Sequence, residues 1–300
     1  MSYARNRPHR EFDLSYFDPS EMSDGSVVLL VGRRGSGKST LAADLMSYRL
    51  ECKRGLCISG TETKNPFWGE YIPSCFIHSE WDPGLVETLF EDQEKVKKWK
   101  GAMQPTFGVF DDLMFNKDFV KSPVIREVFM NGRHSKLFTL VTAQWLMDVP
   151  ASLRANVDYV FVLKDNVRAN RERVYTQFGG MFDDMYTFDS VMKQLTEDHH
   201  CMVLRNKSLS YNVSDCVSFY KATPDLKYKL CAPEYWRYSE RQKLKEKDGE
   251  QAGQKQTKRV RVNKVYRPAP PMAASADSDD DDAPLSYADR YRSLRAASST

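Results

Sequence analysis

The residues at 32–39, Gly-Arg-Arg-Gly-Ser-Gly-Lys-Ser, match the pattern G-x-x-x-x-G-K-[ST]. The apolar run Val27–Val31 precedes this motif, and a helical pattern, Ser39–Leu50, follows it. Glycines let the backbone turn tightly and direct its N–H groups at phosphate oxygens, and the N-terminus of the next helix adds partial positive charge there. The order strand, loop, helix therefore predicts a phosphate-binding loop within an α/β fold.

The motif assigns roles to three side chains that follow its last glycine. Lys38 is expected to reach the β- and γ-phosphates of a nucleoside triphosphate, the Ser39 hydroxyl to hold Mg²⁺, and Thr40 to contact the α-phosphate. The residues expected to bind the nucleotide are Gly32, Arg33, Arg34, Gly35, Ser36, Gly37, Lys38, Ser39 and Thr40. The alternative is a chance match, against which the strand before the motif and the helix after it both argue.

Five short apolar or β-branched runs recur between residues 27 and 163. They are Val27–Val31, Gly55–Ser59, Phe107–Phe110, Leu137–Val141 and Asp158–Leu163. The runs are continuous rather than alternating, which is typical of strands covered on both faces of a parallel sheet. Helical patterns such as Gly84–Lys100 lie between them, so we expect a doubly wound α/β sheet. Two more strands are expected at His200–Arg205 and Val217–Lys221, after the amphipathic segment Phe188–Leu195.

Composition narrows the class of protein. Lys and Arg number 44 and Asp and Glu 41, so the net charge of +3 does not by itself indicate a nucleic-acid-binding protein. No stretch approaches the roughly 18 apolar residues of a membrane helix, and the N-terminus has no apolar signal segment. The six cysteines form no C-x-x-C pair, which favours a reducing compartment over a zinc site or a disulfide framework.

The chain is expected to have three parts: an N-terminal extension at 1–24, a nucleotide-hydrolysing domain at 25–238, and a disordered tail at 239–300. The tail is almost free of aliphatic clusters, so it buries too little apolar surface to offset its chain entropy. It is mostly basic up to Arg267 and acidic at Asp277–Asp282. The basic part, Lys255–Arg267, has three interpretations that the sequence leaves open: a DNA-binding arm, a nuclear-import signal or a solvated linker.

An acidic pair, Asp111 and Asp112, directly follows the third apolar run. A bound Mg²⁺-nucleotide needs a carboxylate at the end of a neighbouring strand, and hydrolysis needs a base beside the γ-phosphate. We expect Asp111 to bind Mg²⁺ through a water, and Asp112 to orient or deprotonate the attacking water. The alternative is a strand-end turn capped by two aspartates.

The fourth run ends in Thr142-Ala143-Gln144. If this strand lies between the loop strand and the acidic strand, the Gln144 amide can hydrogen-bond the γ-phosphate or the attacking water. The alternative is an ordinary loop glutamine. Asn116-Lys117-Asp118 lacks the spacer of the guanine-reading N-K-x-D motif, so ATP is the expected nucleotide.

Further motifs follow in a fixed order over residues 22–222. With the loop they are Gly32–Thr40, Ser59–Glu62, Phe110–Asp112, Asn131–His134, Thr142–Gln144, Val149–Phe161, Asn170–Arg171, Phe178–Phe182, Thr196–Asp198 and Phe219–Ala222. This set resembles the poxvirus-type genome-packaging ATPases of large double-stranded DNA viruses, a branch of the FtsK/HerA superfamily of P-loop NTPases. Ala151 departs from the pattern, which often has a second proline there, and the tail after Arg237 matches none of it. Many proteins with the additional-strand architecture have Glu where this chain has Asp112.

The resemblance implies a RecA-like additional-strand P-loop NTPase, with a mostly parallel central sheet flanked by helices. It implies an ATP- and Mg²⁺-dependent motor, a homo-oligomeric ring that pumps double-stranded DNA into a preformed virion. The implied partners are the DNA and a capsid or virion-membrane protein. The implied location is the infected host cell, at a cytoplasmic assembly site or in the nucleus, with association with the virion as a further expectation.

Ring ATPases commonly complete the site with an arginine from the adjacent subunit, which stabilises charge in the transition state. Arg133, Arg154 and Arg171 are candidates, and Arg154, in the loop after the Gln144 strand, is the preferred one. A packaging motor must grip any sequence, so DNA contact is expected through phosphates. Candidates for that contact are Lys117, Lys121 and Arg126, besides the basic tail.

Three other functions remain open from the sequence. A small-molecule P-loop kinase would share the loop, but predicts an arginine-rich lid and no glutamine at position 144. A nonenzymatic ATP-binding assembly factor would not need Lys38, Asp111 and Asp112 together. A cellular FtsK/HerA-type translocase or helicase would lack the viral motif set.

Overall fold

The computed structural model describes residues 10–257, with side chains as far as Lys245. The strands are β1 (Ser15–Tyr16), β2 (Val27–Val31), β3 (Gly55–Ser59), β4 (Ile77–His78), β5 (Thr106–Asp111), β6 (Leu137–Ala143), β7 (Tyr159–Val162), β8 (His200–Arg205) and β9 (Val217–Lys221). The helices are α1 (Lys38–Ser47), α2 (Pro83–Lys100), α3 (Lys117–Lys121), α4 (Pro123–Asn131), α5 (Ala151–Arg154), α6 (Arg168–Phe178), α7 (Met185–Leu195), α8 (Val213–Cys216) and α9 (Pro233–Thr257).

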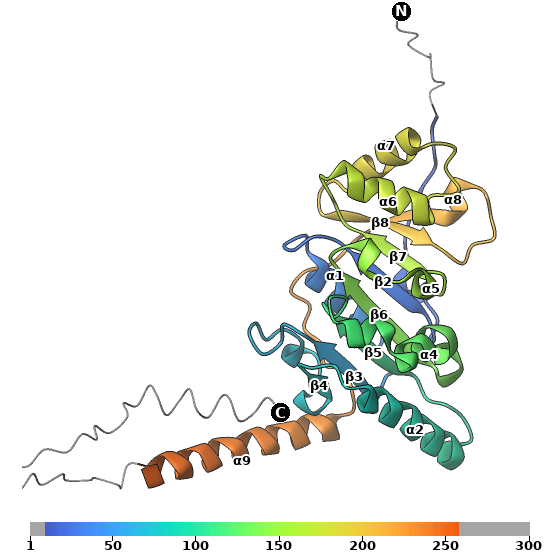
Figure 1. Cartoon of the computed structure of the whole chain (residues 1–300). Coiled ribbons are helices and arrows are strands. Elements are labelled where there is room, and N and C mark those ends of the chain that lie inside the picture. Colours follow the sequence, from blue (N-terminus) through green and yellow to red (C-terminus); the bar gives the residue numbers. More distant parts are fainter. Residues whose placement is uncertain (1–9, 258–300) are drawn as a thin grey trace, which may run out of the picture. The chain divides into compact units, whose positions relative to one another are not determined.

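The described strands form one sheet in the order β1-β9-β8-β7-β2-β6-β5-β3-β4 (Figure 1). β2 pairs in parallel with β6 and β7, β5 pairs in parallel with β6 and β3, and β8 is antiparallel to both β7 and β9. β6 is thus the additional strand between the loop strand β2 and the acidic strand β5. The carboxyl ends of β2, β6, β5 and β3 meet at one edge of the sheet. The fold class expected from the sequence, an additional-strand P-loop NTPase with a mostly parallel sheet, is confirmed.

The central strands β2, β3, β5 and β6 are buried on both faces, as the continuous apolar runs predicted. In β2, Val27, Leu29 and Val31 pack into one core with α2, α4, α6 and α7, whereas Val28 and Leu30 pack into a second core with α1. Figure 1 shows α1 and α4 on opposite sides of β2, β6 and β5. β-Branched and aliphatic side chains suit these central strands, because the strands have no solvent-facing side to which polar residues could turn.

The predicted start of the domain at residue 25 is too late. Ser15 and Tyr16 pair with β9, and Phe17 is fully buried against Phe161 and Tyr220. A two-residue strand and one anchoring aromatic give no periodic signal, so hydropathy patterns could not reveal them. The described part of the N-terminal extension is therefore part of the domain, joined to it by β1 and by the buried Phe17.

The predicted disorder from residue 239 onward is wrong for residues 239–257, which lie in α9. This segment is rich in Glu, Gln, Lys and Arg, which are good helix formers. Its first turns are also anchored, because Ser239 is buried and its hydroxyl accepts a hydrogen bond from the Cys75 N–H. Residues 258–300, with most of the basic segment and the acidic run, lie outside the described part of the chain. Between residues 10 and 257, no helix is long and apolar enough to cross a membrane.

A strap at residues 222–232 connects β9 to α9 across the α1 face of the sheet. The Tyr228 hydroxyl donates to the Ala43 carbonyl of α1, and the Leu230 N–H donates to the Tyr71 carbonyl at 2.8 Å. Leu230 is fully buried. The strap therefore closes the second core over α1 and over the loop that follows β3.

Candidate active site at the carboxyl edge of the sheet

The phosphate loop leaves the carboxyl end of β2 and turns into α1. Its entry is fixed because the Gly32 N–H donates to the Ala143 carbonyl of β6 at 3.1 Å. Its tip is fixed because the N–H and hydroxyl of Ser36 both donate to the Arg33 carbonyl, at 3.2 and 2.7 Å. These bonds hold the loop in a tight turn at the helix N-terminus, the arrangement that binds an anion.

The geometry of the loop requires both glycines of the motif, Gly32 and Gly37. Gly37 has φ 94°, a left-handed conformation that other residues rarely adopt, and it forms the N-cap of α1. A side chain on Gly32 would place its Cβ 2.6 Å from the Ser36 hydroxyl oxygen. The glycines expected from the motif therefore have a conformational reason at one position and a steric one at the other.

Lys38 opens α1 and lies at the mouth of the loop. Its Nζ donates to the carbonyls of Gly32 and Arg33, at 2.6 and 3.1 Å. Burial lowers the pKa of this ammonium group, while the nearby charges of Asp112 and Asp111 act in the opposite direction. The structure thus brings the loop lysine and the acidic pair into one electrostatic site.

Asp111, the last residue of β5, has both carboxylate oxygens held by neutral donors. The Thr142 hydroxyl donates to Oδ1 at 2.7 Å, while the Ser59 hydroxyl and the Trp68 indole N–H donate to Oδ2 at 3.1 and 3.2 Å. Hydroxyl and indole donors orient a carboxylate without neutralising its charge. Asp111 therefore presents a fixed negative charge at the edge where Lys38 lies.

Asp112 follows in a left-handed conformation, with φ 53°. Its N–H donates to the Thr142 hydroxyl at 2.9 Å, and its Oδ1 accepts a hydrogen bond from Gln144 Nε2 at 2.9 Å. A non-glycine residue with this φ is uncommon and is often found at functional sites. The turn separates the two carboxylates, so that Asp112 meets the Gln144 amide while Asp111 stays with β3 and β6.

The donor set fits a Mg²⁺ ion that arrives with a nucleotide. The Ser39 hydroxyl in the first turn of α1 and the Asp111 carboxylate are the hard oxygen ligands that Mg²⁺ takes, and a nucleotide-borne Mg²⁺ needs only one or two protein ligands. Among the described residues, no cluster of three or more His, Cys, Asp or Glu could hold a metal ion. Ser39 and Thr40 are both exposed at this helix N-terminus.

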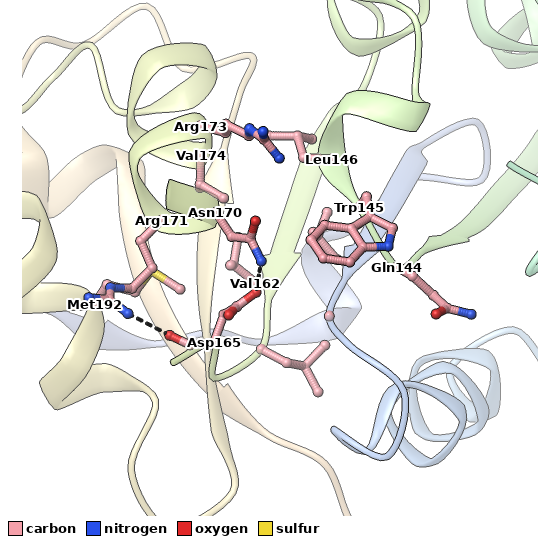
Figure 2. A pocket seen from close by; sticks show the side chains of 13 residues that line it. Gln144, Trp145, Leu146, Val162, Asp165, Asn170, Arg171, Arg173, Val174 and Met192 are labelled. Atoms are coloured by element: carbon pink, nitrogen blue, oxygen red, sulfur yellow. Dashed lines mark hydrogen bonds between the residues drawn. The ribbon is translucent and has the colours of Figure 1, made fainter. Parts of the chain in front are cut away.

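Two hollows flank the loop. The first, shown in Figure 2, has a volume of only about 20 Å³, room for about one water molecule. Asn170 and Arg171 hydrogen-bond Asp165 there, and Gln144 and Trp145 lie on the other side of the hollow. The second is an open cleft of about 520 Å³, large enough for a nucleotide. It is lined by Arg33, Arg34, Gly35, Ser36, Gln144, Trp145, Lys164, Asn166 and His199.

The structure holds Arg154, the arginine preferred for action on a neighbouring subunit, within its own chain. Arg154 is 7% exposed, and its guanidinium donates to the Val149 carbonyl of its own chain. Arg171 is equally buried and pairs with Asp189. Arg133 is exposed, but it precedes β6 and lies at the amino edge of the sheet, away from its own phosphate loop. Arg154 and Arg171 therefore serve the fold of their own subunit.

Sequence reasoning missed the residues that hold the acidic pair. Thr142 was expected only as part of a motif, yet its hydroxyl joins Asp111 and the Asp112 N–H. Ser59 and Trp68 come from the β3 strand and the loop after it, and neither had been considered as a site residue. The one available signal was that Ser59 begins a motif of the resemblance. Asn116, examined as a base-reading residue, caps α3 through its side-chain oxygen.

Comparison with known proteins gives relatives among viruses. No family model matches the chain. An uncharacterized protein of Acanthamoeba polyphaga mimivirus is 31% identical over 236 residues, covering 76% of this chain and 83% of that protein. One of Invertebrate iridescent virus 3 is 30% identical over 209 residues, covering 69% and 79%. One of Frog virus 3 is 30% identical over 242 residues, covering 77% and 74%.

Similar solved structures are more distant. The genome packaging NTPase of Sulfolobus turreted icosahedral virus 2, in complex with ATP-gammaS, is 17% identical with a TM-score of 0.48, covering 68% of this chain and 100% of that chain. The secretion ATPase EccC of Thermomonospora curvata is 15% identical with a TM-score of 0.47, covering 74% and 41%.

The viral relatives match most of their own length as well as most of this chain, and the sheet order and loop are those of an additional-strand P-loop NTPase. The chain therefore belongs to the family of proteins that these large DNA viruses share.

Proposed function

We propose that this protein is the ATPase of a viral DNA-packaging motor, which hydrolyses ATP with Mg²⁺ and couples hydrolysis to movement of double-stranded DNA into the virion. One observation carries the hydrolytic part. Lys38, Asp111, Asp112 and Gln144 converge at one edge of the sheet, joined through hydrogen bonds and by the electrostatic interaction of both carboxylates with the lysine.

The loop and Lys38 bind the phosphates. Lys38, now held by two loop carbonyls, can exchange these for the β- and γ-phosphate oxygens, which offer full negative charge in return for its desolvation. Ser39 and Asp111 would hold the Mg²⁺, which neutralises developing charge on the phosphates when bound. Arg33 and Arg34 line the cleft beside the loop and add positive charge for an anionic substrate.

Asp112 is the residue that orients and deprotonates the attacking water. Gln144 occupies its Oδ1, and its Oδ2 is the oxygen proposed to take the proton. In hydrolysis, the water oxygen bonds to the γ-phosphorus, the bond from that phosphorus to the β–γ bridging oxygen breaks, and ADP carries away the bonding electron pair. Because the Gln144 amide contacts Asp112 directly, it is placed to couple the presence of the γ-phosphate to the position of β6.

Two observations support DNA as the translocated substrate: the ordered motifs, and the membership of this chain in a family of proteins that large DNA viruses share. Lys117, Lys121 and Arg126 are exposed on α3 and α4, just after the acidic strand, and are suited to contact DNA phosphates. The resemblance also supports a homo-oligomeric ring, a capsid or virion-membrane partner, and action inside the infected host cell or in association with the virion.

The decisive experiment measures ATP turnover with and without long duplex DNA, for the wild type, Lys38→Ala and the control Lys193→Ala. Lys193 is an exposed lysine on α7 that pairs with Asp189. We expect DNA to stimulate turnover by the wild type and by the control, and Lys38→Ala to be inactive under both conditions. If DNA does not change the turnover of the wild type, the proposed DNA-translocating motor is contradicted. If the wild type hydrolyses no nucleotide, the proposed ATPase activity is contradicted.

A second experiment tests whether neighbouring subunits share a site. Wild type mixed with Asp112→Asn in rising proportion should lose activity faster than the fraction of inactive chains increases. Arg133→Ala tests the exposed arginine: we expect it to keep nucleotide binding and lose turnover if that residue acts on a neighbour. Activity strictly proportional to the wild-type fraction would contradict a shared site.

A further inference from the structure

The indole of Trp68 is fully buried, and its only polar atom points to a carboxylate. Trp68 packs edge-on against Phe67, with ring centroids 5.3 Å apart, and lies in the same core as α1. Its Nε1–H donates to Oδ2 of Asp111 at 3.2 Å. A buried indole N–H requires an acceptor, and here the acceptor belongs to the carboxylate that the proposed function places on Mg²⁺.

The position of Trp68 is set by a second carboxylate. Glu62 receives three backbone N–H groups of the same loop, those of Phe67 and Trp68 on Oε2 and that of Gly69 on Oε1, each at 3.1 Å. Successive N–H groups that converge on one carboxylate form a strong, charge-assisted turn. The turn fixes the backbone of Trp68 and, through it, the direction of the indole N–H.

The far end of the same loop is fixed by the strap. The Tyr71 carbonyl accepts the Leu230 N–H, and the Tyr71 ring stacks on Tyr228 at 4.8 Å between centroids. Tyr228 in turn bonds the carbonyl of Ala43 in α1. Contacts therefore fix the loop between Glu62 and Tyr71 at both ends. A rigid loop of this kind is needed to orient a neighbouring carboxylate.

From this geometry we infer that Trp68 and Glu62 are positioning residues for the Mg²⁺-binding carboxylate: Glu62 fixes the turn, and the Trp68 indole fixes the orientation of Asp111. This inference rests on the proposed function, which makes Asp111 the metal ligand. Outer hydrogen-bond partners of this kind typically change metal affinity or activity by about 10- to 100-fold when removed. Ser59 donates to the same oxygen, so the loss should be partial rather than complete.

The first test compares Trp68→Phe with Trp81→Phe. Both substitutions replace a tryptophan by phenylalanine near the end of β5, because Trp81 packs against Phe110 and Phe119, but Trp81 donates no hydrogen bond to Asp111. Binding of a fluorescent ATP analogue is measured in EDTA and across a Mg²⁺ titration. Trp68→Phe should raise the Mg²⁺ concentration that gives half-maximal enhancement of binding by about 10- to 100-fold. The affinity for the analogue in EDTA should be unchanged. Trp81→Phe should match the wild type.

The second test avoids a cavity in the core and uses Glu62→Gln beside Glu70→Gln, an exposed carboxylate in the same loop. Glu62→Gln loses the charge that holds the turn, so we expect the same Mg²⁺ defect in a smaller degree. Its kcat should fall with little change in KM for ATP, because loop binding of the phosphates is intact. Glu70→Gln should behave as the wild type does.

A third readout does not depend on ATPase activity. The nitrogen-15 indole resonance of Trp68, identified by its loss in Trp68→Phe, should shift in Asp111→Asn and should broaden in Glu62→Gln. The inference would be overturned if both Trp68→Phe and Glu62→Gln responded to Mg²⁺ as the wild type does. It would also be overturned if the indole resonance did not shift in Asp111→Asn. If the wild type binds no nucleotide while the indole resonance does respond to Asp111→Asn, the proposed function fails and the contact stands.

Discussion

The two edges of the sheet both carry acidic side chains but hold them in different ways. At the amino edge, carboxylates pair with cations: Asp158 with Lys207, Asp24 with Lys136, and Glu21 with Arg205. At the carboxyl edge, Asp111 and Asp112 are held by hydroxyl, indole and amide donors. A paired carboxylate has its charge neutralised, whereas one held by neutral donors keeps its charge for a cation that comes from outside.

β2 joins these edges and makes the comparison direct. Its first residue, Val27, donates its N–H to Asp158 at 2.7 Å, and its carboxyl end leads into the phosphate loop. We therefore expect acidic groups at the amino edge to act on stability, and those at the carboxyl edge to act on the proposed chemistry. Substitutions at matched positions can separate these two effects.

The largest expected effect is at the carboxyl edge. Asp112→Asn keeps the shape of the side chain and removes its ability to take a proton, so ATP turnover should fall by about 10²–10⁴-fold, the typical contribution of a positioned general base. Nucleotide affinity and Tm should change little, because a carboxylate held by neutral donors does not depend on an ion pair. Turnover and thermal unfolding of the same preparation check this. A variant with normal turnover and a lowered Tm would make Asp112 a structural residue.

At the amino edge the expectation is reversed. Asp158 is 5% exposed and accepts the Val27 N–H, so Asp158→Ala leaves that buried donor without a partner and should cost about 1–3 kcal/mol of unfolding free energy. The half-exposed Lys207 adds little to this. Turnover per folded molecule should stay at the wild-type level. Urea unfolding measures the free energy of unfolding, and an ATPase assay at urea concentrations below the transition measures turnover per folded molecule. If Asp158→Ala loses turnover but not stability, the two edges do not differ in the way described.

Most of the candidate site could be predicted from the sequence because its signals are local. The loop motif, the apolar runs and the acidic pair each occupy consecutive residues, and four expected strands, Val27–Val31, Gly55–Ser59, His200–Arg205 and Val217–Lys221, are observed with the same bounds. Placing Gln144 beside Asp112 needed only the inference that its strand lies between the other two. Parallel strands deliver their carboxyl ends to one edge whatever the loops between them do.

The support of the site was not predictable, because it depends on contacts between distant segments. Trp68 reaches Asp111 only once the loop after β3 has folded against the strap, and nothing in its neighbouring sequence marks it. Arg154 reads as an exposed loop arginine, but the short helix α5 buries Leu153 beside it and turns its guanidinium to Val149. Tertiary packing determines the contacts of both side chains, and the hydrophobic periodicity of the sequence carries no information about such contacts.

A moderate effect is expected from Gln144, which touches the acidic pair without being charged. Gln144→Ala removes a hydrogen bond to the Asp112 carboxylate, and bonds to charged groups contribute about 1.5–3 kcal/mol. If that bond orients Asp112 in the transition state, kcat should fall by about 10- to 100-fold with KM for ATP unchanged. Gln194→Ala, an exposed glutamine on α7, is the control. A rise in KM alone would place Gln144 in ground-state binding of the phosphates.

The smallest effect is expected at the pair Lys136–Asp24, whose side chains are 47% and 36% exposed. An ion pair exposed to this degree contributes about 0–1 kcal/mol, so Asp24→Ala should hardly change the urea midpoint. Lys136 also has φ 49°, a left-handed conformation that costs a non-glycine residue about 1–2 kcal/mol. Lys136→Gly should therefore be more stable than Lys136→Ala, although both lose the ion pair. If Lys136→Ala and Lys136→Gly are equally stable, the backbone carries no strain at this position. If Asp24→Ala lowers the urea midpoint strongly, ion pairing at the amino edge contributes more to stability than its exposure indicates.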